Sequence, residues 1–186
     1  LFQGSGADSY SWIGPNSFTS ALQDPVISDS DLTDSGLYTL IGTNTNGCRD
    51  SITTNINVFP LPVVMATADQ AEYCEEETIQ LNVNSGTSYT WSGPDGFTSN
   101  LQSPSIINST TAQQGTYTIQ ISDVNGCTNQ GQVSILVISS PAVTIAGDVS
   151  VCEGELVQLT AQGNASTYSW TGPAGVMSSN MIITVP

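Results

Sequence analysis

The sequence predicts an all-β fold made of small β-sandwich domains in tandem. Three observations carry this prediction. A segment of about 79 residues recurs along the chain of 186 residues. Within one copy, short runs of alternating apolar and polar residues are separated by turn residues at intervals of roughly 8 to 12 residues, as in sandwiches. No segment of ten or more residues has the apolar periodicity of a helix.

The repeat is clearest around the tryptophans. SYSWIGPNSFTSALQDPVI begins at Ser9, SYTWSGPDGFTSNLQSPSI begins at Ser88, and YSWTGPAG begins at Tyr168. A repeat of this length with its own core residues indicates a domain, because solenoid units run to roughly 20 to 50 residues. We predict an N-terminally truncated domain at 1–60, a complete domain at 61–139 and a C-terminally truncated domain at 140–186. These three segments are called the first, second and third repeat below.

The first five residues, LFQGS, have two interpretations. They resemble the scar of a cleavable tag, which would be excluded from fold reasoning. They also belong to LFQGSGADSYSW, which aligns without a gap with LTAQGNASTYSW before Trp170, and this favours native sequence. Under the second interpretation, the chain is a window from a longer array that opens and closes inside domains.

The second repeat predicts its strands in order. They are Val63–Ala68, Thr78–Val83, Ser88–Ser92, two weaker strands near Phe97 and at 105–107, Thr116–Ser122 and Gln132–Val137. Apolar and polar residues alternate along the second of these strands, so we expect Ile79, Leu81 and Val83 to face the core. The G-P-D-G sequence at 93–96 predicts a turn.

Two Asn-Gly pairs predict hairpins. Asn125-Gly126 precedes the last strand of the second repeat, and Asn46-Gly47 occupies the same place in the first. A type I′ turn requires positive φ at both central residues, which Asn and Gly tolerate best. We therefore expect a two-residue type I′ turn at each pair.

The recurring aromatic residues are predicted to be core. Trp12, Trp91 and Trp170 each follow a tyrosine by two positions in a predicted strand, the place of the central tryptophan of a two-sheet sandwich. The alternative is an aromatic that stacks on a sugar or binds a peptide. Tyr38 and Tyr117 follow a glycine by two positions and predict the tyrosine corner, in which the hydroxyl bonds to nearby backbone.

These motifs carry a resemblance to a known group of proteins. They are C-E-G-E-x-x-x-L at Cys152, Y-x-W-x-G-P-x-G at Tyr89 and Tyr168, G-x-Y at Gly115 and N-G-C at Asn125. The units resemble the immunoglobulin-like repeats of very large surface proteins of Bacteroidetes, including gliding-motility adhesins exported by the type IX system. The resemblance implies an immunoglobulin-like sandwich in a surface protein and implies no ligand. The related polycystic-kidney-type domain has W-x-F-G-D-G where this chain has W-x-G-P-x-G, so its acidic loop is not carried over.

Four cysteines occupy two positions per repeat. Cys74 and Cys152 precede the second strand, and Cys48 and Cys127 follow the Asn-Gly pairs. Outside the cytosol such pairs predict disulfides. One interpretation joins Cys74 to Cys127. The other joins each cysteine before the second strand to the Asn-Gly cysteine of the next domain, because immunoglobulin connectivity separates the two positions within a domain by about a strand length, roughly 20 Å. Free thiols and links between chains remain further alternatives.

The acidic residues have two interpretations. Glu75, Glu76 and Glu77 follow Cys74, and Asp123 stands before the Asn-Gly pair. Calcium uses such oxygen ligands to stiffen extracellular arrays, but no D-x-[DN]-x-[DN]-G loop is present. The alternative is a solvated acidic edge. We expect no other metal and no cofactor.

Composition excludes several classes of function. The chain has 16 Asp and Glu, one cation (Arg49) and no histidine, for a net charge of -15. Nucleic acid and anionic membranes are improbable partners, because phosphate binding requires clustered Lys or Arg. Catalysis that uses histidine or lysine is excluded, so we expect no enzyme.

The leading functional hypothesis is a structural stalk or filament segment of a large secreted or cell-surface adhesin. Its partners would be neighbouring repeats of the same chain and further copies in a filament, without membrane insertion. The alternative is a set of carbohydrate-binding modules of a secreted polysaccharide-degrading enzyme. Phe18 and Phe97 are its recurring aromatic candidates, and the third repeat has Val176 at that place.

Overall fold

A computed structural model describes residues 2–147, 150–173 and 177–185. By its contacts the chain divides into two compact units. One contains the chain up to Thr67 with Leu81–Pro104 and Tyr117–Val133, and the other contains Ala68–Gln80, Ser105–Thr116 and the chain from Ser134 onward. This division does not follow the repeats, so the boundaries after residues 60 and 139 stay predictions.

The regular structure of the described residues is β, apart from three short 3-10 helices. These are η1 (Leu32–Asp34), η2 (Pro94–Gly96) and η3 (Thr111–Gln113). The all-β prediction is therefore confirmed. No helix in these residues is both long and apolar enough to cross a membrane.

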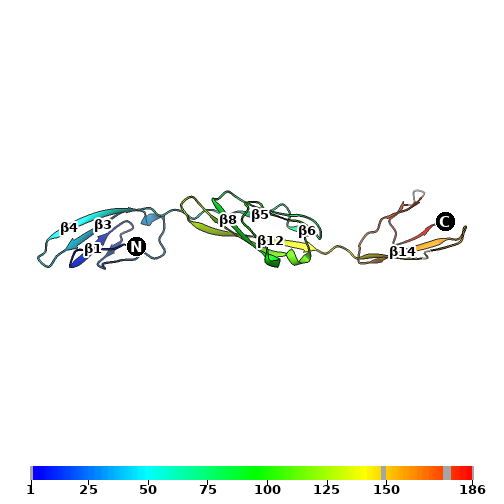
Figure 1. Cartoon of the computed structure of the whole chain (residues 1–186), viewed down its shortest axis with the longest axis horizontal. Coiled ribbons are helices and arrows are strands. Elements are labelled where there is room, and N and C mark those ends of the chain that lie inside the picture. The colour runs from blue at the N-terminus through cyan, green and yellow to red at the C-terminus, as the bar shows by residue number, and fades with distance from the viewer. Residues whose placement is uncertain (1, 148–149, 174–176, 186) are drawn as a thin grey trace. The chain divides into compact units, whose positions relative to one another are not determined.

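The first repeat forms one antiparallel sheet with the order β2-β1-β3-β4 (Figure 1). Its strands are β1 (Ser9–Ile13), β2 (Thr19–Ser20), β3 (Gly36–Thr43) and β4 (Arg49–Ile56). Trp12 lies opposite Leu40 in the register, and both are buried. Strand β4 ends the sheet, and nearly all of its side chains are exposed.

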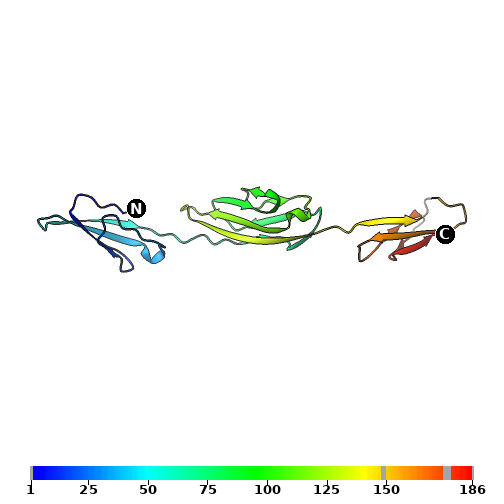
Figure 2. The same ribbon diagram turned by 90° about the horizontal axis from the view of Figure 1, so that it is seen from below.

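The second repeat forms two sheets of an immunoglobulin-like sandwich, with orders β10-β7-β5 and β6-β12-β11-β8-β9 (Figure 2). The strands are β5 (Ala66–Ala68), β6 (Glu72–Cys74), β7 (Ile79–Val83), β8 (Ser88–Ser92), β9 (Thr98–Ser99), β10 (Ser105–Ile106), β11 (Gly115–Ser122) and β12 (Thr128–Ile138). The neighbouring strands whose register is described pair antiparallel, except that β6 runs parallel to β12.

Alternation along the strands supplies the core of the second repeat. In β7 the expected residues Ile79, Leu81 and Val83 are buried, while the two residues between them are half-buried. Strand β11 buries Tyr117, Ile119 and Ile121 in the same period of two. Strand β8 has the predicted bounds, and β12 is longer than predicted at both ends.

The predicted strand Val63–Ala68 is shorter in the structure. Only Ala66–Ala68 joins a ladder. The residues before Ala66 bond to the side chain of Asn84 instead. This side chain accepts from the Met65 N–H at 2.7 Å and donates to the Val63 carbonyl at 2.8 Å. These side-chain bonds satisfy the backbone groups that a ladder would otherwise pair.

Hairpins form at both Asn-Gly pairs, but the predicted type I′ turn is wrong. Gly126 has φ 81°, whereas Asn125 is not among the residues with positive φ. The Asp123 carbonyl accepts from the Gly126 N–H at 3.2 Å, and the Asp123 N–H donates to the Cys127 carbonyl at 3.0 Å. This is the three-residue loop that ends in a left-handed glycine. The Asp123 carboxylate favours it by accepting from the N–H groups of Asn125 and Cys127.

The third repeat forms a sheet of order β13-β14-β17 and a separate pair, β15 with β16. The strands are β13 (Val143–Gly147), β14 (Val157–Gly163), β15 (Trp170–Thr171), β16 (Met177–Ser178) and β17 (Ile182–Val185). Strand β13 lies at an edge of its sheet, as β4 does in the first repeat.

Candidate functional site

The three tryptophans make the same hydrogen bond in all three repeats. Each indole Nε1 donates to the carbonyl of the residue ten positions later. The bonds are Trp12 to Leu22 at 3.0 Å, Trp91 to Leu101 at 3.0 Å and Trp170 to Asn180 at 2.7 Å. Trp12 and Trp91 are buried, and Trp170 is half-buried. With its N–H bonded and its ring in the core, an indole of this kind offers no platform for a sugar.

The tyrosines lie under the Gly-Pro turns. The Tyr38 hydroxyl donates to the Asp34 carbonyl at 2.8 Å, the bond of a tyrosine corner. Burial raises the pKa of Tyr38, and the negative charge of Asp34 adds to this effect. Burial likewise raises the pKa of Tyr117, with a further contribution from Asp95.

The glycine of each Gly-Pro turn is required by these rings. A Cβ on Gly14 would lie 2.4 Å from a ring carbon of Tyr38, and a Cβ on Gly93 would lie 2.3 Å from Tyr117. Real Cβ atoms do not approach so closely. The W-x-G-P motif is therefore a packing motif.

The two phenylalanines proposed as sugar platforms cover the same tyrosines. Phe18 packs edge-on against Tyr38 with ring centroids 5.6 Å apart, and Phe97 packs against Tyr117 at 5.4 Å. Both phenylalanines are half-buried. Val176, at the equivalent place, lies outside the described residues.

The four cysteines are free thiols in the structure. Cys74 lies opposite Ile138, the last residue of β12, whereas Cys127 directly precedes its first residue. An eleven-residue strand rises by about 33 Å, and a disulfide needs Cα atoms within about 7 Å. This register argues against a bond between Cys74 and Cys127. Pairing of cysteines across domains stays a prediction.

The glutamates after Cys74 act as local caps. Glu77 accepts from the Cys74 N–H at 2.9 Å, and Glu155 accepts from the Cys152 N–H at 3.1 Å in the third repeat. Glu75 accepts from Ser140 N–H at 3.1 Å and from Thr111 N–H at 3.4 Å. The C-E-x-E motif is therefore a turn motif, in which the second glutamate closes the turn that the cysteine opens.

The weak calcium candidates do not form a cluster. Asp123 bonds within its own turn, and Glu76, at φ 73°, donates its N–H to the Ser109 carbonyl at 2.7 Å. Across the residues that the structure describes, no three His, Cys, Asp or Glu side chains come together as a metal site would require.

Sequence reasoning missed a buried tyrosine. Tyr73 is only 1% exposed, and its hydroxyl donates to the Asp69 carboxylate. That hydrogen bond lowers the pKa of Asp69, while burial first and Asp69 second raise the pKa of Tyr73. The signal that could have identified the pair is an aspartate four residues before a tyrosine near the strand start.

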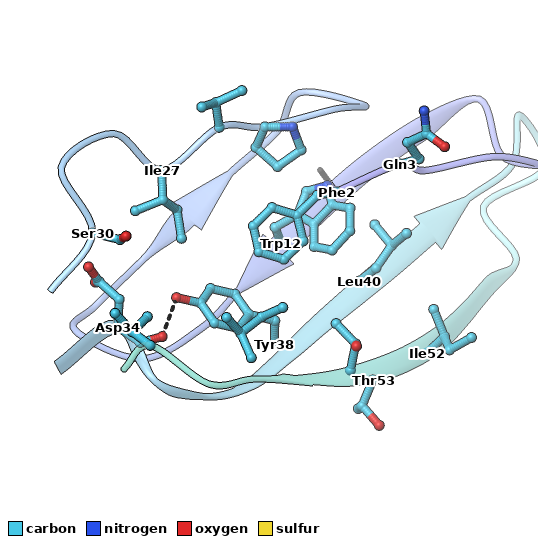
Figure 3. Close-up of a pocket in the computed structure, with 15 residues that line it drawn as sticks. Phe2, Gln3, Trp12, Ile27, Ser30, Asp34, Tyr38, Leu40, Ile52 and Thr53 are labelled. Carbon is cyan, nitrogen blue, oxygen red and sulfur yellow. Dashed lines mark hydrogen bonds between the residues drawn. The ribbon is translucent and has the colours of Figure 1, made fainter. Parts of the chain in front are cut away.

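A groove of about 620 Å³ opens on the first repeat (Figure 3). Aromatic and aliphatic side chains dominate it. Phe2, Trp12, Ile27, Tyr38, Leu40 and Ile52 are among its lining residues. Asp34 lies at one end, where its carbonyl meets the Tyr38 hydroxyl.

Phe2 and Gln3, from the LFQGS segment, line part of this groove. The Phe2 ring packs against Trp12, with centroids 4.9 Å apart, and against Tyr38 at 5.0 Å. Gln23 Nε2 donates to the Gly4 carbonyl at 2.6 Å, and Gln102 Nε2 donates to the Val83 carbonyl at 3.0 Å in the second repeat. The bond recurs 79 residues later, as expected if LFQGS is native sequence.

Comparison with known proteins bears on the second repeat. Residues 60–137 match the family model of the PKD-like domain. Together with its two sheets, this match supports an immunoglobulin-like domain in that segment. None of the curated proteins compared matches the chain.

The solved structures that are similar to this chain have low sequence identity to it. The three N-terminal domains of the outer capsid protein Hoc of bacteriophage RB49 are 13% identical over 97% of this chain and 72% of that chain, with a TM-score of 0.37. The amphioxus IgVJ-C2 molecule is 19% identical over 71% and 91%, with a TM-score of 0.36. Murine CEACAM1b is 15% identical over 71% and 86%, with a TM-score of 0.35. Scores this low carry no functional argument.

In the segment that matches the PKD-like family model, a tight turn at Gly93–Phe97 follows Trp91. Gly93 donates its N–H to the Phe97 carbonyl at 3.0 Å, and Phe97 donates to the Pro94 carbonyl at 3.1 Å. The turn thus closes through its own backbone. Asp95 is its one acidic residue.

Proposed function

We propose that this chain is a structural segment of the stalk or filament of a large secreted or cell-surface adhesin. An immunoglobulin-like or PKD-like sandwich is compatible with such a module. The observation that carries the proposal is that the recurring residues build the fold. The tryptophan bond occurs in three repeats, and the glycine-tyrosine contact and the glutamine bond each occur in two.

The junction between the second and third repeats supports a mechanical role. Pro141 follows Ser140, and proline limits bending because its φ is fixed. The Ser140 N–H is bonded to Glu75, a residue of the turn after β6. This bond ties the first residue of the third repeat to a turn of the second repeat.

The charge supports an extracellular array with many copies. The chain has sixteen carboxylates and one arginine. Like charge of this kind keeps the repeats soluble and makes them repel one another. We propose no enzymatic activity, no metal and no ligand bound at every repeat. The Bacteroidetes origin and type IX export implied by the sequence resemblance belong to this proposal.

An antibody against residues 61–139, applied to intact cells of the source organism, tests the proposal. We expect labelling of unpermeabilised cells, together with no binding of the purified chain to a glycan array. Labelling only after permeabilisation would contradict it. Glycan binding that Phe97→Ala abolishes would favour the carbohydrate-binding alternative.

A further inference from the structure

Two hairpin loops of the same design carry an asparagine directly before a glycine. Asn46 and Gly47 lie between β3 and β4, and Asn125 and Gly126 lie between β11 and β12 at a spacing of 79 residues. Both asparagines are exposed. Asparagine is a thermally labile residue, and a following glycine leaves its own main-chain nitrogen open because glycine has no side chain. The loops are therefore two candidate sites of chemical change in the chain itself.

The reaction at such a pair is intramolecular. The main-chain nitrogen of the glycine loses its proton to a base in the solvent and attacks the side-chain carbon Cγ of the asparagine. A bond from this nitrogen to Cγ forms, the bond from Cγ to Nδ2 breaks, and Nδ2 takes up a proton and leaves as ammonia. Water then opens the succinimide ring at either of its two carbonyl carbons. The products are aspartate and isoaspartate, and the net change is one water consumed and one ammonia released.

The two loops share their main-chain bonds. Gly47 N–H donates to the Asn44 carbonyl at 3.0 Å, and Gly126 N–H donates to the Asp123 carbonyl at 3.2 Å. The two glycines have φ angles of 80° and 81°. Each glycine must release its bond before its nitrogen can attack, so the main chain slows the reaction to a similar extent in both loops.

The loops differ in the side chain of their first residue, which is Asn44 in one and Asp123 in the other. In both, the Oδ1 atom accepts from the N–H groups two and four residues later, at 2.8 to 3.0 Å. Asp123 Oδ2 also accepts from Nδ2 of Asn125 at 3.3 Å. Asn44 has an NH2 group in place of that second oxygen, and this group only donates. In the part of the chain that the structure describes, the Asn46 side chain has no hydrogen-bond partner.

The bond from Asn125 to Asp123 restrains the group that must react. Cγ of Asn125 can meet the glycine nitrogen only if the side chain turns, and turning breaks the bond from Nδ2. A carboxylate adjoins the other loop as well, since Asp8 Oδ2 accepts from the Thr45 N–H at 2.8 Å. The difference between the loops is therefore the bond on the amide and not the presence of a charge.

We infer that Asn46 is a site of spontaneous conversion to aspartate and isoaspartate, and that Asp123 slows the same reaction at Asn125. Every bond that distinguishes the two loops joins residues of the same loop. Conversion of Asn46 adds one negative charge, and isoaspartate also lengthens the main chain of the hairpin between β3 and β4 by one carbon. This inference goes beyond the proposed stalk, since it concerns the chemical lifetime of its loops.

Peptide mass spectrometry of the whole folded chain during incubation in warm, mildly alkaline buffer tests the inference. Conversion appears as the mass change for replacing NH with O, and isoaspartate is identified by its fragmentation. We expect the Asn46 peptide to convert at least about threefold faster than the Asn125 peptide, the effect of a hydrogen bond of ordinary strength. In urea the two rates should agree within about twofold, because each asparagine follows a β-branched residue and precedes Gly-Cys.

Exchanging the first residues of the two loops gives the matched test. Asn44→Asp should slow the conversion of Asn46, and Asp123→Asn should speed the conversion of Asn125, each by at least about threefold. Both variants keep the oxygen that accepts from the N–H groups of the loop, and circular dichroism checks that each is folded. Asn82, inside β7 and followed by valine, is the internal control and should stay unmodified.

Equal rates in the folded chain, or faster conversion of Asn125, would overturn the inference. So would a folded chain in which Asn46 stays intact while both asparagines convert in urea. Rates that neither exchange alters would refute the role of Asp123, because the restraint on Asn125 would then lie elsewhere.

Discussion

The indole Nε1 of Trp91 donates to the main-chain carbonyl of Leu101 at 3.0 Å, across the loop that joins β8 to β10. Trp91 is fully buried. The bond fixes the loop that carries the Gly-Pro turn and β9, so one side chain serves both the core and the loop.

Replacing Trp91 with Phe should destabilise the second repeat by about 2 to 4 kcal/mol. The change removes ring volume from the core and leaves the Leu101 carbonyl without its donor. Urea unfolding followed by circular dichroism measures the loss. Tyr89→Phe, two residues earlier in the same strand, is the comparison. If Trp91→Phe lowers the free energy of unfolding no more than Tyr89→Phe does, the role of the indole bond is contradicted.

Replacing Gly93 with Ala should cost about 1 to 3 kcal/mol, the usual range for overpacking. The new Cβ would meet the ring of Tyr117. A double-mutant cycle with Tyr117→Leu checks the cause, because removing the ring should remove most of the alanine penalty. Additive losses would show that the glycine is required for another reason.

The contact between Asp69 and Tyr73 predicts a loss of stability in acid. The Tyr73 hydroxyl lowers the pKa of Asp69, so between that lowered value and the unfolded value near 3.9 the unfolded chain binds more protons. Stability from this pair is present above pH 4 and is lost as pH falls through the folded pKa. Asp69→Asn should flatten this limb of the stability curve measured by thermal melts. An unchanged limb would contradict the assignment.

The register of β6 on β12 predicts the chemistry of the cysteines. After mild oxidation and proteolysis, mass spectrometry of the monomer should find no peptide linking Cys74 to Cys127. The two residues lie at opposite ends of an eleven-residue strand. A native linked peptide would require a different register.

Much of this fold could be predicted because the residues that recur in each repeat are the ones that form the strands and turns. Residues that recur at a spacing of 79 include the strand Ser88–Ser92 and the Gly-Pro turn, and local patterns identify both. Strand β6 could not be predicted, because three residues that pair in parallel with a distant strand carry no local signal. The turn at Asn125-Gly126 differs from the predicted type I′ because the side chain of Asp123, two residues earlier, accepts from the Asn125 N–H and directs the geometry of the turn.

The functional features were harder to predict from sequence. The glutamates of the C-E-x-E motif suggested a cation, whereas the structure uses Glu77 as a cap for Cys74. Phe97 suggested a sugar platform, whereas its ring covers Tyr117. In each case the role of the side chain depends on its partner in the fold, which the local sequence does not contain.

Force spectroscopy of the chain held between marker domains tests the structural role most directly. The account predicts a discrete unfolding event for residues 61–139, with a gain in contour length of about 25 nm from chain geometry, and a lower unfolding force in Trp91→Phe. Smooth extension without a discrete event would contradict a stalk that resists force.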